Sequence, residues 1–263
     1  MPNRDAHLNL IDSSRQLFEL DPGAEIEVGS GWVFGAGRSP HPVISNAAFR
    51  VDDELDPGEL LGRAQAFFAS RERGFAVWAR DGAAEDRDLI DAAKTAGLKE
   101  VYAMPEMVLD RRAEAHPSPA GVQLRQVVSA SDAADYWRVA TGAYASIGFP
   151  PEIFAFYENH DGLSADNAAA FIADLNGRPA GIAMTIVSHG VAGIYWVGTS
   201  DDARGRGLGW MVTATAVNAG FDLGAEIASL QASPMGESLY LRMGFETIFS
   251  YQLLMSTPPE ADR

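Results

Sequence analysis

Apolar runs separated by short polar turns dominate residues 168–199 and predict a meander of strands. Each turn pair, Asn176-Gly177 and His189-Gly190, joins two such runs, and Asn-Gly is typical of the type I′ turn of a β-hairpin. The runs cover 168–175, 179–187 and 191–199. The pattern therefore predicts three consecutive antiparallel strands.

Helical periodicity follows the meander. Leu208, Met211, Val212 and Ala216 fall on one helix face, and Gly220 or Gly224 is expected to end that helix. Ser233-Pro234 is a good N-cap and first-turn pair for a second helix, which continues through Tyr240 until Gly244. Strands are expected at 122–127, 227–232 and 245–255, a helix after the cap Ser131-Asp132, and a short aromatic helix from Pro150-Pro151 that contains Phe154, Phe156 and Tyr157.

The first half of the chain repeats part of this order. Strands are expected at 26–34, 43–51, 75–79 and 100–109, and helices at 57–70 and 86–96. Residues 93–98 can be laid over residues 240–245, since each follows a helix and precedes an apolar strand, which suggests a diverged internal duplication. The polar segment 111–121 carries two prolines and is typical of a linker. We expect an α/β (α+β) protein of two domains, 1–118 and 119–263.

Composition narrows the chemistry. The 263 residues include no cysteine and five histidines without metal-ligand spacing, so a disulfide framework and a metal site are not expected. The polar start and the lack of an apolar run of about 18 residues predict neither a signal peptide nor a membrane span. A cytoplasmic protein is expected.

The net charge of −16 argues against nucleic acid as a partner, because phosphate contact requires a basic surface. It favours a cationic partner, although the same acidity can serve solubility alone. The oligomeric state cannot be read from the sequence.

A glycine-rich loop lies between the third strand of the meander and the following helix. It consists of Arg204, Gly205, Arg206, Gly207, Leu208 and Gly209. Glycines let the backbone approach an anion closely, a helix N-terminus offers free N–H groups, and arginines add charge-assisted contacts. Trp210 stands where a P-loop needs lysine, and one residue between the last two glycines breaks the Rossmann spacing.

Arg204, Gly207 and Gly209 fit the pyrophosphate loop of the GNAT acetyltransferases, and the chain resembles that family. Leu239-Tyr240 with Gly244-Phe245 resembles its later Leu-Tyr…Gly-Phe signature, and the element order from about 121 to 255 resembles a GNAT domain. The resemblance implies tandem GNAT-like domains, each a mixed, mainly antiparallel sheet flanked by helices. It also implies acetyl-CoA as co-substrate, without a metal. The N-terminal half lacks the loop and has Ala93 where Tyr240 stands, so we expect it to be degenerate and to act as a scaffold.

The resemblance also implies roles for single residues. Backbone groups near Val197, Gly198 and Thr199 would bind the pantetheine arm and thioester, and Gly198 suits either a bulge or close ligand approach. Tyr240 falls at the general-acid position, where a protonated phenol can give its proton to the departing thiolate. Ser233 replaces the asparagine that contacts the cofactor in many members, and it either binds the cofactor or only caps a helix.

The acceptor side is less defined. No base is assigned, and Glu152, Glu158, His160 and His189 are the groups considered. The acceptor is expected near the aromatic segment 144–157, where Phe149, Phe154 and Tyr157 either line a pocket or simply pack a helix. The expected function is transfer of an acetyl group to a primary amine of a small molecule or peptide by direct attack. A noncatalytic acyl-CoA-binding module and transfer of a longer acyl group are the alternatives.

Overall fold

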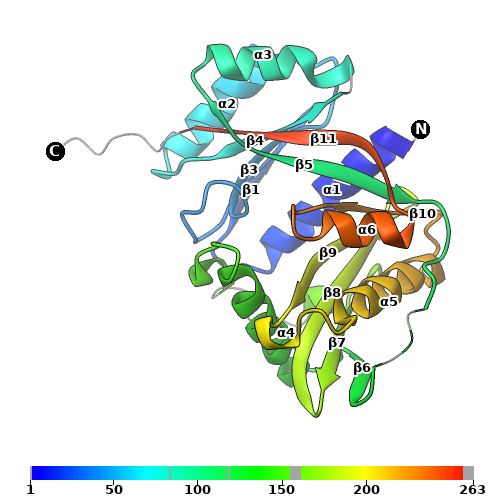
Figure 1. The fold of residues 1–263 in the computed structure, drawn as a ribbon. Coiled ribbons are helices and arrows are strands. Elements are labelled where there is room, and N and C mark those ends of the chain that lie inside the picture. The colour runs from blue at the N-terminus through cyan, green and yellow to red at the C-terminus, as the bar shows by residue number, and fades with distance from the viewer. Residues whose placement is uncertain (1, 83, 116, 118, 155–160, 257–263) are drawn as a thin grey trace.

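The strands that the structure describes join one mixed sheet. The computed structural model describes residues 2–82, 84–115, 117, 119–154 and 161–256. In the described residues the sheet has eleven strands in the order β1-β2-β3-β4-β11-β5-β10-β9-β8-β7-β6 (Figure 1). The strands are β1 Glu25–Val28, β2 Trp32–Ala36, β3 Asn46–Arg50, β4 Ala76–Asp81, β5 Lys99–Leu109, β6 Val122–Gln126, β7 Ala168–Leu175, β8 Arg178–Ser188, β9 Val191–Thr199, β10 Ile227–Gln231 and β11 Glu246–Met255.

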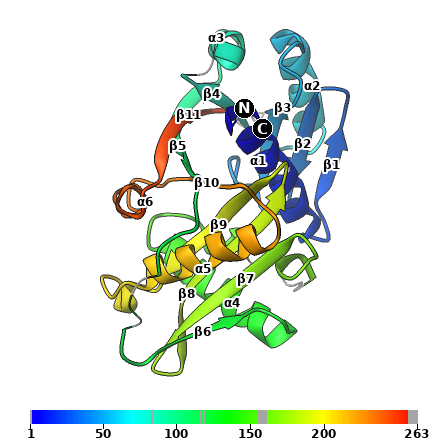
Figure 2. The same ribbon diagram turned by 90° about the vertical axis from the view of Figure 1, so that its right-hand side faces the viewer.

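Helices cover both faces of this sheet. The α-helices are α1 Pro2–Glu19, α2 Pro57–Ala69, α3 Arg87–Thr95, α4 Ala130–Ala145, α5 Leu208–Asp222 and α6 Glu237–Met243. Short 3-10 helices are η1 Ala84–Asp86, η2 Pro151–Ile153, η3 Asp161–Leu163 and η4 Asp201–Ala203. Strands β7 to β9 lie between α4 and α5, which cover opposite faces (Figure 2).

The two halves exchange their last strands. β5, from the N-terminal half, pairs antiparallel with β10, and β11, from the C-terminal half, pairs antiparallel with β4. β5 and β11 also pair with each other and run side by side across the middle of the molecule (Figure 1). Each half therefore completes the sheet of the other, and the sequence did not predict this exchange. The boundary at 118/119 stays a prediction.

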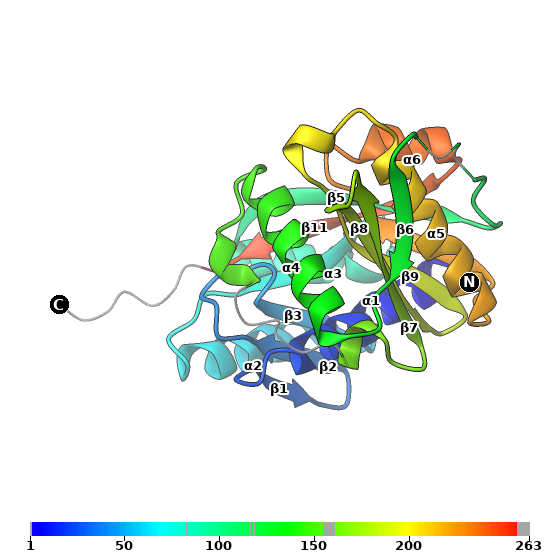
Figure 3. The same ribbon diagram turned by 90° about the horizontal axis from the view of Figure 1, so that it is seen from below.

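The hydrophobic core reflects this arrangement. On one face, α1 and α4 share a single cluster of buried side chains with strands from both halves, and α1 lies beneath strands of both (Figure 3). On the other face, α2 and α3 cover one cluster while α5 and α6 cover another. Burial of apolar area on one shared face thus joins the halves.

Helices α3 and α6 end in the same way, as the predicted duplication implies. Gly97 and Gly244 have φ 86° and 91°, and the next residue of each, Leu98 or Phe245, donates its N–H to the carbonyl five residues before it at 3.0 Å. This is the Schellman pattern of helix termination. Ala93 and Tyr240 accept these two bonds, so the overlay of 93–98 on 240–245 is confirmed in geometry.

The predicted meander is confirmed as β7, β8 and β9, antiparallel throughout. Both turn pairs have positive φ, 51° and 78° at Asn176-Gly177 and 52° and 72° at His189-Gly190, as type I′ turns require. Gly224, with φ 97°, ends the region of α5. Gly220 instead lies inside α5, where a Cβ would meet that of Ala192 at 2.3 Å.

Several local predictions were wrong. The predicted strand 26–34 is two strands joined by a turn at residues 29–31. The polar start, for which no element was predicted, forms the 18-residue helix α1. The N-cap of α4 is Ser129, whose hydroxyl accepts from the N–H of Asp132, in place of Ser131. The segment after Pro150 is η2; Phe156 and Tyr157 lie outside the described residues.

The predicted linker 111–121 packs against α5 in its described part. Ala113 and Asn218 exchange two hydrogen bonds of 3.0 and 3.1 Å, and the indole N–H of Trp210 donates to the Glu114 carbonyl at 3.0 Å. The connection is therefore held to the C-terminal half rather than free.

Candidate functional site

The glycine-rich loop (residues 204–209) joins the end of β9 to the start of α5. Gly205 and Gly207 have φ 72° and 81°, a left-handed backbone that other residues adopt at a cost. Gly207 is the N-cap of α5, and no side chain caps the helix there. The two glycines are thus required by the shape of the turn, as the sequence predicted.

The first turn of α5 leaves backbone donors free. Met211 is the first residue of the helix whose N–H reaches a carbonyl behind it, that of Gly207 at 3.1 Å. The N–H groups of Leu208 and Gly209 precede it and have no such acceptor. Together with the helix dipole, they form a site for an anion such as a phosphate.

The two arginines of the loop differ. Arg204 contacts Asp201 at 2.7 Å and donates to the Ser146 hydroxyl at 2.5 Å, just beyond the C-terminal end of α4. Its guanidinium therefore fastens the loop to α4. Arg206 is exposed and has no ion-pair partner within the described residues, so Arg206 is the charge available to an incoming anion.

An opening between β9 and β10 lies beside the loop. The two strands are parallel and pair only from Val191–Ile227 to Gly193–Ser229, so the backbone of β9 from Ile194 to Thr199 is unpaired on this side. An unpaired strand edge can bind an extended ligand as an added strand would. Val197, Gly198 and Thr199, whose backbone groups the resemblance assigns to the pantetheine arm and thioester, lie on this unpaired and splayed part of β9.

A β-bulge sits in the same part of β9. The register against β8 shifts between Ile182–Gly198 and Met184–Tyr195, which leaves Trp196 and Val197 opposite one residue, and Trp196 has φ 50°. The bulge is thus centred before Gly198 rather than on it. The glycine at position 198 is instead explained by close packing, because a Cβ there would lie 3.0 Å from that of Ala143 in α4.

Gly209 marks the point where three elements meet. A Cβ on Gly209 would lie 3.3 Å from Leu239 Cδ2 on α6 and 3.8 Å from Thr199 Oγ1 at the end of β9. The glycine-rich loop, the splayed strand and the helix of the second motif are therefore brought together, although residues 199 and 239 are far apart in sequence. The sequence had placed all three in one site by resemblance alone.

Tyr240 lies on α6 facing the site. It is 7% exposed, and burial raises the pKa of its phenol. Its hydroxyl has no hydrogen-bond partner in the described part of the chain. A Cβ on Gly236 would come within 3.3 Å of the hydroxyl, so glycine leaves room on that side. A protonated and unpartnered phenol can donate a proton to a nearby anion.

Tyr144 on α4 is a second phenol in this region, which the sequence analysis did not single out as polar. Its hydroxyl donates to the Val197 carbonyl in the bulge at 3.4 Å. Burial raises the pKa of Tyr144, and the electrostatic influence of Tyr240 adds to it, which places the two phenols near each other. The Tyr144 phenol therefore contacts the bulge, and the Tyr240 phenol lies close to that of Tyr144.

Ser233 precedes α6 and shapes its approach. Its hydroxyl accepts from the N–H of Gly236 at 3.2 Å, and its carbonyl accepts from Gly236 and Glu237 at 2.9 and 3.0 Å. The helix itself starts at Glu237 with Gly236 as N-cap, so the predicted cap at Ser233 was three residues early. The Ser233 hydroxyl is engaged in this turn.

Of the groups considered as bases, the two that lie in the described residues do not converge on the opening. His189 lies in the turn at the far end of β9 and bonds Asp12 at 2.8 Å; nine strand residues separate the two ends of β9 by about 27 Å. Glu152 is exposed on η2. Glu158 and His160 lie outside the described residues.

Aromatic side chains cover the bulge on the α4 face. The ring of Tyr144 packs on Phe149, Phe154 and Trp196 with centroids 5.3 to 5.8 Å apart. Phe154 is 3% exposed, so it packs the core. Tyr157 lies outside the described residues.

The N-terminal half also reaches this side. The ring of His41 packs on Phe149 at 5.5 Å, and His41 lines a depression of about 210 Å³ with Ser39, Pro40, Pro150 and Glu152. The His41 Nδ1 accepts from the N–H groups of Val43 and Ile44 at 3.4 and 3.3 Å, which leaves its proton on Nε2. Sequence analysis did not find His41, because the loop that carries it belongs to the other half.

The corresponding place in the N-terminal half is acidic. There the loop 51–56 leads from β3 to α2, as the glycine-rich loop leads from β9 to α5, and it contains Asp52, Asp53, Glu54 and Asp56. The Asp56 carboxylate accepts from the N–H of Glu59 at 2.9 Å and caps the helix. A phosphate would meet carboxylates there, which supports the expectation that this half does not bind a phosphorylated cofactor.

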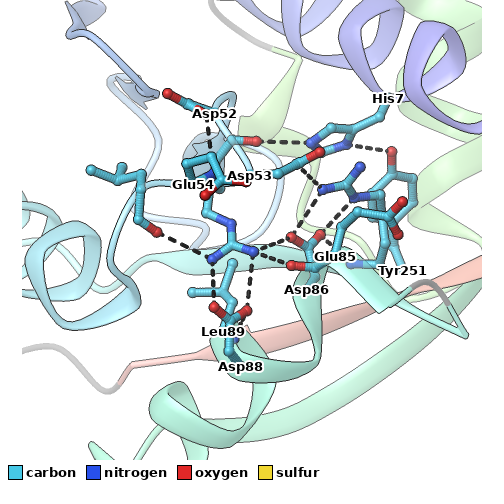
Figure 4. A network of polar contacts seen from close by, with 12 residues as sticks. His7, Asp52, Asp53, Glu54, Glu85, Asp86, Asp88, Leu89 and Tyr251 are labelled. Carbon is cyan, nitrogen blue, oxygen red and sulfur yellow. Dashed lines mark hydrogen bonds and ion pairs between the residues drawn. The ribbon is translucent and has the colours of Figure 1, made fainter.

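A buried ion-pair network takes up the interior of that half (Figure 4). Arg80 binds both oxygens of Asp86 at 2.7 and 3.0 Å, and Arg50 contacts the same carboxylate at 3.2 Å. His7 from α1 bonds the Tyr251 hydroxyl from β11 at 2.9 Å and the Arg50 carbonyl at 2.8 Å. The network therefore fastens α1 and β11 to the N-terminal half.

Two further searches of the described residues bear on function. No group of three or more His, Cys, Asp or Glu side chains there is arranged to hold a metal ion. No helix in the same residues is long and apolar enough to cross a membrane.

Comparison with known proteins gives the fold and matches part of the chain to a family. Residues 109–232 match the family described as acetyltransferase (GNAT) domain. The structure is similar to a GCN5-related N-acetyltransferase from Kribbella flavida, with 21% identity, a TM-score of 0.71 and 95% of each chain covered. It is also similar to a GCN5-related N-acetyltransferase from Sphaerobacter thermophilus, with 14% identity, a TM-score of 0.65, and 100% of this chain and 96% of that chain covered.

A tandem arrangement occurs among the similar structures. A tandem GNAT protein from the clavulanic acid biosynthesis pathway has 14% identity and a TM-score of 0.62, with 95% of this chain and 96% of that chain covered. None of the curated proteins matches the sequence. The likeness over nearly the whole chain confirms the predicted fold class.

Proposed function

Because residues 109–232 match the GNAT acetyltransferase family, we propose that this chain transfers an acetyl group from acetyl-CoA to a primary amine by direct attack in a ternary complex. The observation that carries the proposal is the meeting of three parts at Gly209. These are the N-terminus of α5, which no side chain caps, the unpaired edge of β9, and the helix that bears Tyr240.

The residues present fit acetyl-CoA. The free N–H groups at Leu208 and Gly209 and the exposed charge of Arg206 would hold the pyrophosphate. Backbone groups of Val197 to Thr199, unpaired toward β10, would hold the pantetheine arm. Bound there, acetyl-CoA supplies the activated acetyl group. Ser233 and Arg204 support the loop and helix around it through their own contacts.

Tyr240 acts as the proton donor in this proposal. A buried phenol whose pKa is raised stays protonated at neutral pH and can protonate the departing thiolate. The phenol has no internal acceptor among the described residues, so its proton is available for donation to the thiolate.

The acceptor enters from the side of α4, where the bulge of β9 and the depression beside His41 lie. The net charge of −16 favours a cationic amine over an anionic one, since an acidic protein attracts positive ligands. The acceptor is therefore proposed to be a small-molecule or peptide ammonium.

A thiol-release assay with acetyl-CoA across a panel of primary amines tests the proposal. We expect amine-dependent release of coenzyme A, faster with acetyl-CoA than with longer thioesters. Titration calorimetry should give one acetyl-CoA per chain, because the N-terminal half presents carboxylates where the loop would be.

Other results would point to other functions. Binding without thiol release for any amine would favour a noncatalytic acyl-CoA-binding module. Faster release with larger thioesters would assign a longer-chain acyltransferase. Two bound acetyl-CoA molecules would contradict the assignment of a single site.

A further inference from the structure

A buried carboxyl group lies one strand away from the opening between β9 and β10. Glu106 belongs to β5, the exchanged strand of the N-terminal half, and none of its surface is exposed. Its Oε2 accepts from the side-chain amide of Gln231 on β10 at 2.6 Å. Its Oε1 is buried and has no hydrogen-bond partner among the described residues. A buried carboxyl oxygen without a hydrogen-bond partner lowers the stability of the fold. Such atoms are rare in native structures, and a catalytic role is one explanation for them.

The surroundings of Glu106 are polar on the face covered by α1. Tyr195 on β9 and Tyr251 on β11 are close enough for the carboxyl to raise their pKa values. Ser229, the next residue of β10 on the same face, has a buried hydroxyl without a partner in hydrogen-bond geometry. Further charges act on this group of side chains through the tyrosines: Asp12 on α1, and Arg80 and Asp86 of the N-terminal network.

Strand register places this group of side chains at the edge of the opening. Pairing of β9 with β10 ends at Gly193 and Ser229, and the opening begins with the residues that follow. Gln231, which pairs with Glu106, lies on the β10 side of it, and Tyr195 lies on the β9 side, directly before the bulge. The Glu106 carboxyl therefore lies beyond the β10 wall of the opening, where it is hydrogen-bonded to Gln231 of that wall and close enough to Tyr195 of the β9 wall to influence its pKa.

We infer that Glu106 accepts the proton that the acceptor ammonium must lose before it attacks, so that the N-terminal half supplies part of the active site. This inference rests on the proposed function. Because Glu106 is fully buried, it acts through the polar groups between it and the opening, as a proton acceptor that does not itself touch the substrate.

The protons balance in this scheme. The bound ammonium loses one proton, which Glu106 takes on its free Oε1 and later releases to solvent. The neutral amine then forms the C–N bond as the C–S bond breaks. The second proton leaves the nitrogen, and the thiolate gains one from Tyr240, whose phenol is restored by that second proton. No oxidant or further reactant is needed.

The protonation state of Glu106 suits this role. Burial raises its pKa to about 8, despite the opposing hydrogen bond from Gln231. A proton acceptor is most effective when its pKa lies near the working pH. Wild-type kcat/KM for an alkylamine should therefore rise with pH and level off above about pH 8.

The test compares Glu106→Gln with wild type on two acceptors: the most active alkylamine of the panel, which is protonated at pH 8, and hydroxylamine, which is largely unprotonated. We expect kcat/KM for the alkylamine to fall at least about tenfold, with its levelling above pH 8 lost. The rate with hydroxylamine and the affinity for acetyl-CoA should be nearly unchanged. Glu106→Asp should recover part of the alkylamine activity, and Glu100→Gln, an exposed site on the same strand, serves as the matched control.

The outcomes separate the possible failures. Equal losses with both acceptors, or a wild-type pH profile in Glu106→Gln, would overturn the role of Glu106 while the proposed function stands. A wild-type protein that binds acetyl-CoA but releases no thiol with any amine would overturn both.

Discussion

Replacement of Glu106 by glutamine should stabilise the protein relative to wild type, by a margin that grows as the pH rises. The carboxyl is fully buried, and its pKa in the folded protein is about 8 against an ordinary value of 4.5. Between these values the folded chain binds a proton that the unfolded chain releases, so the stability of the wild type falls with increasing pH. Glutamine keeps the shape and the bond to Gln231 but does not titrate.

The magnitude follows from linkage. Each pH unit between the two pKa values lowers the free energy of unfolding by up to about 1.4 kcal/mol. Because the unfolded carboxyl is still partly protonated at pH 5, the advantage of Glu106→Gln over wild type should grow by about 2.5 kcal/mol between pH 5 and pH 7. This exceeds the effect of most surface substitutions, which stay within about 0.5 kcal/mol.

Urea unfolding, followed by tryptophan fluorescence at several pH values, measures this difference. The other titrating groups are common to both proteins and cancel in the comparison. Glu100→Gln, on the exposed part of β5, should run parallel to wild type over the same range. Parallel curves for wild type and Glu106→Gln would refute the elevated pKa and the reasoning built on it.

Three further predictions concern the loop, the phenol and the ion-pair network. Tyr240→Phe should lower kcat at least about tenfold in the thiol-release assay and leave the calorimetric affinity for acetyl-CoA unchanged, whereas the exposed Tyr102→Phe should change neither; unaltered turnover in Tyr240→Phe would remove that phenol from the mechanism. Gly207→Ala and Gly224→Ala lie at opposite ends of α5 with φ 81° and 97°, so each should cost about 1–2 kcal/mol of stability, but only Gly207→Ala should weaken acetyl-CoA binding by calorimetry; equal affinities would separate the loop from the cofactor. Arg80→Met removes both side-chain hydrogen bonds from Arg80 to the buried Asp86 carboxylate, which keeps only its contact with Arg50 as an ion pair among the described residues. The substitution should lower the free energy of unfolding by about 3–5 kcal/mol in urea, and a change below about 1 kcal/mol, the range of exposed pairs, would contradict a buried network.

Short-range signals predicted much of the fold. The turn pairs at 176–177 and 189–190 and the terminating glycines at 97, 224 and 244 all adopt positive φ, because glycine and asparagine tolerate a backbone that other residues avoid. Such conformations depend on a few neighbouring residues, so they can be inferred locally. The missed helix α1 shows the limit, since its polar first turn hid a face that becomes buried only against strands of both halves.

The glycine-rich loop could also be inferred from the sequence, because anion binding at a helix start needs only the residues of the turn itself. The spacing of the loop and the second motif, by resemblance, led to the family that the comparisons support. The sequence of the loop does not show which contacts its side chains make in the folded protein. That Arg204 is fastened to α4 while Arg206 stays free depends on a contact with a residue 58 positions away.

The sequence by itself determined the turns, most helices and the glycine-rich loop, where the deciding interactions lie within a few residues. Only the tertiary structure decided that β5 pairs with β10 and β11 pairs with β4, because strand pairing is determined by hydrogen bonds and burial across the whole sheet. That exchange carries Glu106 to Gln231, 125 residues later in the chain, and desolvates its carboxyl. A glutamate within an expected strand gave no sign of this, since its pKa depends on neighbours that only the folded sheet assembles.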